Sequence, residues 1–262
     1  MHLFEFEDFP WFPNFLRIAM TRYIVAIHKM LGSGPELVSL LKRALKQSGQ
    51  KEIVDLCAGG GGPMQEVLGT LREEEEFKDV KLTFTDLYPN VDVAAEIKAL
   101  NDPNITYETE SVDATKVGTE RKGLRTMICS LHHMRPNLAR KILEDAQNSK
   151  QPFCAFEISD NSFPKWIWWI AFPINYLMVF FITFMVRPMT WQQVVFTYFI
   201  PLLPLFIAWD GAVSNARTYT LEDMDILLEG LETEDYHWEK GLIKGKAKKL
   251  YLLGMPTAKS LE

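Results

Sequence analysis

The chain has 262 residues, with 34 acidic and 28 basic side chains and a net charge of −6. This length is enough for one α/β domain with additions. An acidic chain without a dense stripe of lysine and arginine is not expected to take nucleic acid as its main substrate. The 3 cysteines lack the spacing of metal ligands and lie at or in expected strands, so we expect buried thiols and no metal.

Residues 1–50 form a first region, ahead of the expected strands. Its aromatic and acidic start is expected to be a surface strap or a flap that closes over a pocket. The acidic residues argue against a signal peptide, which would begin with basic residues. Helices are expected over residues 14–30 and 35–47, the first with apolar residues spaced along one face.

A short strand, a glycine run and a helix follow. The strand covers Ile53 to Leu56, the glycines are Gly59 to Gly62, and the helix begins near Pro63. Glycines allow the backbone to approach a nucleotide-like ligand closely. Asp55 at the end of the strand would repel a pyrophosphate but attract an ammonium group, so the expected ligand carries an amino group.

Similar strands recur along the next hundred residues. Residues 81–84 alternate polar and apolar side chains and lead to Asp86. An acid at this place accepts hydrogen bonds from ribose hydroxyls in nucleotide-binding units, although a turn or helix-capping role is the alternative. Further strands are expected at residues 105–107, 126–130 and 153–158, with a helix over residues 136–147.

This series of units resembles the class I S-adenosylmethionine (SAM) methyltransferases, with Cys57 where a first glycine is commoner. The resemblance covers about residues 50–160 and 220–256. It implies an α/β, Rossmann-like fold whose seven-stranded, mostly parallel sheet has an antiparallel last strand, and it implies SAM as the cofactor. The residues that it assigns to SAM are Asp55, Cys57, Ala58, Gly59, Gly61, Asp86, Leu87, Asp113, Ala114 and Ser130.

The resemblance gives a role to Asp113 and is weaker just before the fourth strand. In the family the position of Asp113 holds the adenine amino group, although a solvated loop aspartate is the alternative. The stretch from Ala114 to Leu124 is also short for the usual helix before the fourth strand. At the other end, a helix over residues 220–231 and strands at 236–243 and 249–253 match the antiparallel hairpin that closes the family's sheet.

A hydrophobic insert interrupts the core. From Trp166 to Trp209 the only charged residue is Arg187. The stretches on either side of it would each span roughly 28–31 Å as helices, and tryptophans lie near their ends. We therefore expect two helices in a bilayer hairpin over residues 164–209, with shallow insertion, a buried helix pair or a dimer interface as alternatives.

The insert follows the fifth strand, so it should lie beside the ligand, which in open parallel sheets binds at the carboxyl ends of the strands. The segment after the insert is polar and is a candidate substrate-binding site through Asp210, Arg217 and Tyr219. The alternative is that Asp210 and Arg217 simply pair with each other.

Three residues are candidates for a catalytic base. His132 and His133 follow the fourth strand, where the transferred methyl group should lie, and Glu157 ends the fifth. A histidine can accept a proton from a hydroxyl near neutral pH. We favour His132, while helix capping and packing are the alternatives for the histidines.

The sequence thus predicts an enzyme that transfers a methyl group from SAM to a lipophilic small molecule or lipid, on the cytoplasmic face of a membrane. The expected parts are residues 1–50, a SAM-binding core at 51–163, the insert at 164–209 and the rest of the core at 210–262. The alternatives are a methyltransferase for a soluble substrate whose insert is a dimer interface, and a SAM-binding membrane protein without catalysis.

Overall fold

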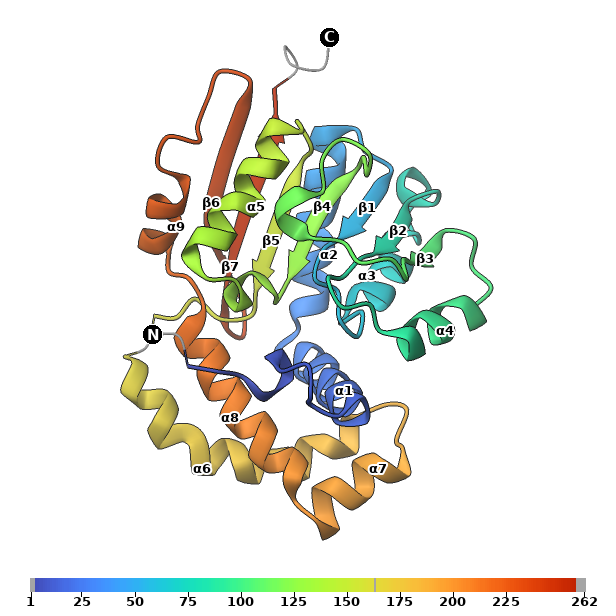
Figure 1. The fold of residues 1–262 in the computed structure, drawn as a ribbon, viewed down its shortest axis with the longest axis vertical. Coiled ribbons are helices and arrows are strands. Elements are labelled where there is room, and N and C mark those ends of the chain that lie inside the picture. The colour runs from blue at the N-terminus through green and yellow to red at the C-terminus, as the bar shows by residue number, and fades with distance from the viewer. Residues whose placement is uncertain (1–2, 163, 258–262) are drawn as a thin grey trace.

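The computed structural model describes residues 3–162 and 164–257, and within them a seven-stranded sheet forms the centre of the molecule (Figure 1). The strand order is β3-β2-β1-β4-β5-β7-β6. The first five strands pair in parallel, whereas β7 runs antiparallel to β5 and β6. The strands are β1 (Glu52–Asp55), β2 (Lys81–Phe84), β3 (Ile105–Tyr107), β4 (Leu124–Ile128), β5 (Phe153–Glu157), β6 (Tyr236–Lys244) and β7 (Lys248–Pro256). This order confirms the predicted class I methyltransferase fold.

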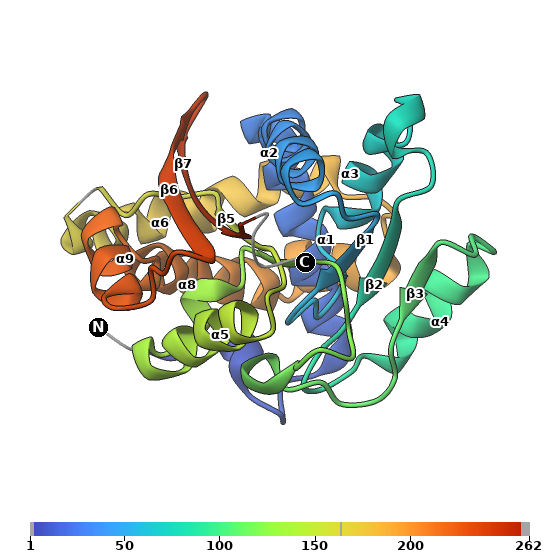
Figure 2. The same ribbon diagram turned by 90° about the horizontal axis from the view of Figure 1, so that it is seen from above.

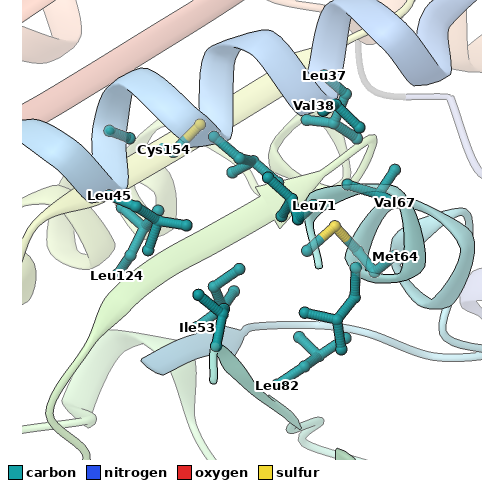
Figure 3. Close-up of a cluster of buried hydrophobic side chains, with 14 of the residues drawn as sticks. Leu37, Val38, Leu45, Ile53, Met64, Val67, Leu71, Leu82, Leu124 and Cys154 are labelled. Carbon is teal, nitrogen blue, oxygen red and sulfur yellow. The ribbon is translucent and has the colours of Figure 1, made fainter. Parts of the chain in front are cut away.

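Helices cover both faces of the sheet (Figure 2). One face carries α2 (Ser33–Ser48), α3 (Met64–Leu71) and α4 (Val91–Ala99), and the other carries α5 (Pro136–Asn148) and α9 (Leu221–Leu228). The spacing of Leu37, Leu41 and Ala44 places all three on one side of α2, where each is fully buried. Figure 3 shows this core, in which Cys154 is a small buried residue, as expected.

A separate helical layer lies beyond the end of the sheet to which the parallel strands point (Figure 1). It consists of α1 (Asn14–Leu31), α6 (Lys165–Ile182), α7 (Trp191–Val194) and α8 (Leu202–Arg217). Residues from the chain start, α1 and the insert together form its own hydrophobic core, which includes Leu16, Met20, Val179 and Ile207. The insert therefore packs on the N-terminal helix and covers the carboxyl ends of the strands.

The insert is not the simple two-helix hairpin that the sequence predicts. Its second arm is α7, then a π-helical turn at Val195–Phe199, then α8. The chain bends by 85° between the last two. Pro201 lies at this bend, and proline has no amide hydrogen to continue a helix. α8 then continues to Arg217, through the segment expected to be a polar connection.

Within the described residues, no single helix is long and apolar enough to cross a membrane. Two bent pairs of helices satisfy the same test by length and composition: α1 with α2, bent by 87°, and residues 191–199 with α8. The predicted bilayer hairpin is therefore not found as two single helices of the required length, and insertion in a membrane stays a prediction.

The outer side of α6 is apolar and exposed. Its large side chains recur at helical spacing, with exposed fractions between 58% and 68%: Trp166, Ile170, Ile174, Leu177 and Phe181. We call this set the apolar face of α6. A contiguous exposed apolar surface of this kind marks a site of contact with a partner or a membrane.

Candidate active site

The glycine-rich loop follows β1 at the carboxyl edge of the sheet. Cys57 begins it with a φ of +55°, a left-handed conformation that favours glycine and explains why glycine is commoner at this position. Gly60 lies under α1, where an added Cβ would lie 2.7 Å from Thr21 Cγ2. The absence of a side chain at Gly60 thus lets the N-terminal helix pack directly on the loop.

Asp86, after β2, holds the loop in place. Its Oδ2 accepts a hydrogen bond from the Gly59 amide at 2.8 Å, and its Oδ1 accepts one from the Tyr88 amide at 2.8 Å. The Tyr107 hydroxyl donates to the Gly59 carbonyl at 2.9 Å. The acid that the sequence assigns to the ribose therefore also orders the glycine-rich loop beside it.

Asp55 is buried at the end of β1, and its Oδ1 accepts a hydrogen bond of 2.5 Å from the Thr126 hydroxyl of β4. Burial raises the pKa of Asp55, the Thr126 hydrogen bond opposes this effect and the nearby Asp86 carboxylate adds to it, with a net result of about 7. A bound ammonium group would stabilise the ionised form. The side chain thus meets the expectation of an acid placed at the ligand end of β1.

The other residues assigned to SAM lie at the same edge with different surroundings. Asp113 is exposed and caps the short 3₁₀ turn Ala114–Lys116, because its Oδ1 accepts hydrogen bonds from the amide and hydroxyl of Thr115. This turn replaces the usual helix, as the short stretch predicted. Ser130 is buried after β4, and its Oγ has no hydrogen-bond partner among the described residues. An unpaired hydroxyl at this edge is available to a ligand.

His132 and Glu157 form a buried pair that joins the ends of β4 and β5. His132 Nδ1 lies 2.8 Å from Glu157 Oε2, and the His132 amide donates to Glu157 Oε1 at 3.3 Å. In the neutral ring, donation from Nδ1 to this carboxylate leaves the free electron pair on Nε2. Within the described residues, Nε2 is buried without a hydrogen-bond partner.

His133 has a different environment, because it faces the N-terminal strap (residues 3–13). Its Nδ1 lies 2.8 Å from Asp8 Oδ1 and 3.6 Å from Glu5 Oε2, and its Nε2 lies 3.7 Å from Glu7 Oε1. Burial alone would lower the pKa of His133, but these three carboxylates raise it to about 10. A histidine that keeps its proton at neutral pH is a poor base, so His132 is the better candidate.

The three polar residues predicted to bind substrate hold this strap and its surroundings. Asp210 accepts hydrogen bonds from the Phe6 and Glu7 amides at 2.8 and 3.2 Å. The Tyr219 hydroxyl donates to the Met134 carbonyl at 2.7 Å. Asp210 does not pair with Arg217, and direct contact of these residues with substrate stays a prediction.

Arg217 ties the strap to the turn after β4. Its NH1 lies 2.9 Å from Glu5 Oε1 and 2.8 Å from Asp8 Oδ2, and its NH2 donates to the His133 carbonyl at 2.9 Å. Sequence reasoning missed the roles of Glu5 and Asp8. The signal available was the mixture of acids with aromatic residues at the chain start, which is unusual for a surface segment.

A cavity of about 370 Å³ opens beside the strap. Its lining is Leu3, Phe4, Asp8, Phe9, His133, Arg135, Leu138 and Arg217. A larger cavity, of about 600 Å³, lies between α4 and β3 at the edge of the sheet and is lined by neither histidine. The smaller cavity is therefore the one that leads toward the histidines.

No model of a known protein family matches the chain, and no curated protein matches it. Solved structures share its general arrangement at low identity. A SAM-dependent methyltransferase from Aquifex aeolicus is 10% identical, with a TM-score of 0.46 over 84% of this chain and 88% of that one. The methyltransferase domain of bacterial CtHen1 is 13% identical, with a TM-score of 0.48 over 88% and 99%.

The mitomycin 7-O-methyltransferase MmcR is 15% identical, with a TM-score of 0.46 over 80% of this chain and 50% of that one, so this chain matches about half of its length. These values describe a distant similarity. The assignment of the fold rests instead on the strand order and on the loop at the end of β1. Both features define the fold of the class I SAM-dependent methyltransferases.

Replacing Asp86 should weaken SAM binding. In the Asp86→Ala variant the ribose hydroxyls lose a charged acceptor and the Gly59 amide loses its partner, so we expect a loss of about 1–3 kcal/mol in binding free energy. Isothermal titration calorimetry measures this. An unchanged affinity in a folded variant would leave Asp86 with a structural role alone.

SAM affinity should depend on pH through Asp55. Because the pKa of Asp55 is about 7 and the ammonium group of SAM prefers the carboxylate, affinity should fall by up to about tenfold per pH unit as the pH drops below that value. Calorimetry between about pH 5.5 and 7.5 tests this. The Asp55→Asn variant is the control and should bind weakly with no such slope. A flat profile in the wild-type protein would rule out the proposed contact.

Proposed function

We propose that this protein transfers a methyl group from SAM to an oxygen of a lipophilic small molecule that reaches the site from a membrane surface. One observation carries the proposal. The glycine-rich loop, Asp55, Asp86 and the free Nε2 of His132 lie at the ends of adjacent strands, on one edge of the sheet. Ligands of open parallel sheets bind at this edge.

The chemistry follows from the positions of these groups. SAM bound between the loop and Asp86 would place its methyl end toward β4, where Ser130 and His132 lie. Methyl transfer needs the acceptor oxygen in line with the departing sulfur, so positioning supplies much of the rate. We propose that His132, with its ring held by Glu157, is the residue that acts on the acceptor hydroxyl.

Two features support a lipophilic acceptor. The cavity beside the strap combines the apolar side chains Leu3, Phe4 and Phe9 with His133, whose ring centroid lies 4.3 Å from that of His132. The apolar face of α6 lies one helix away, because α6 packs on α8 and α8 holds the strap through Asp210. We propose that this face rests on the bilayer and that the acceptor comes from the lipid.

Replacement of His132 should greatly lower the rate of methyl transfer without weakening SAM binding. We expect His132→Ala to lower the rate of methyl transfer by roughly 10²–10⁴, with SAM affinity nearly unchanged. A radiolabelled-methyl assay on a lipid extract measures the rate, and calorimetry measures the affinity. His237→Ala is the matched control, because His237 is an exposed histidine of β6.

Full activity in His132→Ala would mean that another residue acts on the acceptor hydroxyl. Glu157→Ala and His133→Ala would then be the next variants. SAM binding by the wild-type protein without methyl transfer to any extract component would favour the non-catalytic alternative. Loss of SAM binding in His132→Ala would instead indicate a structural role.

The apolar face of α6 should bind membranes. We expect the protein to float with phosphatidylcholine vesicles in a density gradient, and Ile174→Glu with Phe181→Glu to weaken binding at least about tenfold. The reason is that each large apolar side chain transferred from water contributes about 1.5–3 kcal/mol. The control is Ile226→Glu, which changes an isoleucine of α9 that is 69% exposed.

A wild-type protein that stays at the bottom of the gradient would contradict the membrane proposal. Analytical ultracentrifugation would then test the dimer alternative, in which the same two substitutions dissociate the dimer and Ile226→Glu does not.

A further inference from the structure

The two histidines and the strap form a cluster whose members have the chemistry of metal ligands. One ligand atom each from Glu5, His132 and His133 lie within 4.8 Å of one another. The glutamate is fully buried and comes from the start of the chain, whereas the histidines follow β4. Ligands about 2.1 Å from a common ion lie roughly 3–4 Å apart, so small side-chain movements would complete such a site.

The His132 ring is oriented as it is in metal sites. His132 Nδ1 contacts Glu157 and His133 Nδ1 contacts Asp8, each at 2.8 Å. A histidine that binds a metal through one nitrogen commonly donates the other N–H to a carboxylate, which fixes the ring and raises its basicity. Glu157 is therefore in the position of a supporting carboxylate for His132, whereas His133 Nδ1 faces both Asp8 and, at 3.6 Å, Glu5.

The His132 ring provides an independent indication of a ligand. Its Nε2 is buried, and no hydrogen-bond donor among the described residues satisfies it. A buried acceptor without a partner is destabilising. A cation or a bound acceptor molecule would remove that cost.

The charges of the cluster also favour a cation. Among the described residues, the carboxylates that contact the two rings are Glu5, Glu7, Asp8 and Glu157. Arg217 neutralises part of this charge through Glu5 and Asp8. The carboxylates outnumber this arginine, and a bound cation would compensate for the remaining negative charge.

We propose that Glu5, His132 and His133 bind one divalent transition-metal ion, with positions left open for the oxygen of the methyl acceptor. Two imidazoles with one carboxylate suit Mn²⁺, Fe²⁺ or Zn²⁺ better than Mg²⁺ or Ca²⁺. A role of the ion in methyl transfer rests on the proposed function. Binding of the ion by these three residues does not depend on that function. Sequence spacing hides this site, because its glutamate and its histidines are far apart in the chain.

In the reaction the ion would act as a Lewis acid. An acceptor hydroxyl bound to it loses its proton to water more readily. The resulting oxygen anion forms a bond to the methyl carbon of SAM while the carbon–sulfur bond breaks, and that electron pair stays on sulfur. His132 would then act on the acceptor through the ion rather than by taking the proton itself.

Mn²⁺ titration of the full-length protein, stripped with a chelator and followed by electron paramagnetic resonance, tests the proposal. We expect about one tightly bound ion per chain, with nitrogen couplings from imidazole in the spin-echo spectrum. Glu5→Gln and His132→Gln should each weaken binding by about 10- to 100-fold or more, and Glu157→Gln by about 10-fold. His237→Gln, on the exposed face of β6, should bind as the wild type does.

Absence of Mn²⁺ binding, absence of nitrogen couplings, or equal binding by Glu5→Gln and His132→Gln would each overturn the proposal. The nitrogen couplings need no variant, so they decide the question even if a substitution prevents folding. SAM calorimetry on the same samples distinguishes failure of the metal proposal from failure of the proposed function. SAM binding without Mn²⁺ binding would leave the proposed function in place with His132 as a direct base.

Discussion

The pairing of Arg217 with Glu5 holds the site together. The arginine side chain is 6% exposed and the glutamate side chain is 0% exposed, so neither charge is well solvated. Removing one partner of a buried ion pair costs about 3–5 kcal/mol, because the other charge stays behind unpaired. The same guanidinium contacts Asp8 and the His133 carbonyl, and thereby joins the chain start, the turn after β4 and α8. The strap is thus an integral part of the site.

The strap and the helical layer together cover the carboxyl ends of the strands. The sheet alone would leave the ends of β4 and β5 open to water. The helical layer covers them, and its core combines α1 with the insert, two segments that are distant in sequence. α1 also packs against Gly60 through Thr21, so the layer that covers the acceptor side contacts the glycine-rich loop as well. The helical layer therefore borders both the proposed cofactor site and the proposed acceptor site.

The central sheet could be predicted from the sequence, because its information is local. Apolar residues such as Ile53 and Val54 mark a buried strand, Asp55 ends it, and Asp86 follows β2 at the expected place. The insert could be recognised by composition but not by shape. Pro201 indicates a break in the helix, but hydropathy does not encode that α8 packs against α6 after the bend.

The candidate site was predictable in part for the same reason. The sequence places His132, His133 and Glu157 near one another, since adjacent parallel strands end together. It cannot show that one ring pairs with Glu157 while the other faces three acids, because those acids belong to the chain start. Only the tertiary fold distinguishes the two histidines.

The contact between Glu5 and Arg217 joins residues 212 positions apart, which makes it one of the most non-local contacts in the chain. During synthesis the strap leaves the ribosome well before its partner, which emerges only after the sheet's parallel strands and the whole insert. Until Arg217 emerges, Glu5 and Asp8 lack the guanidinium that they contact in the folded protein. Closing so long a loop has an entropic cost that the preformed sheet and helical layer reduce. Completion of the site is therefore a late folding event, and a nascent chain that ends before α8 would carry its glycine-rich loop without a closed acceptor pocket.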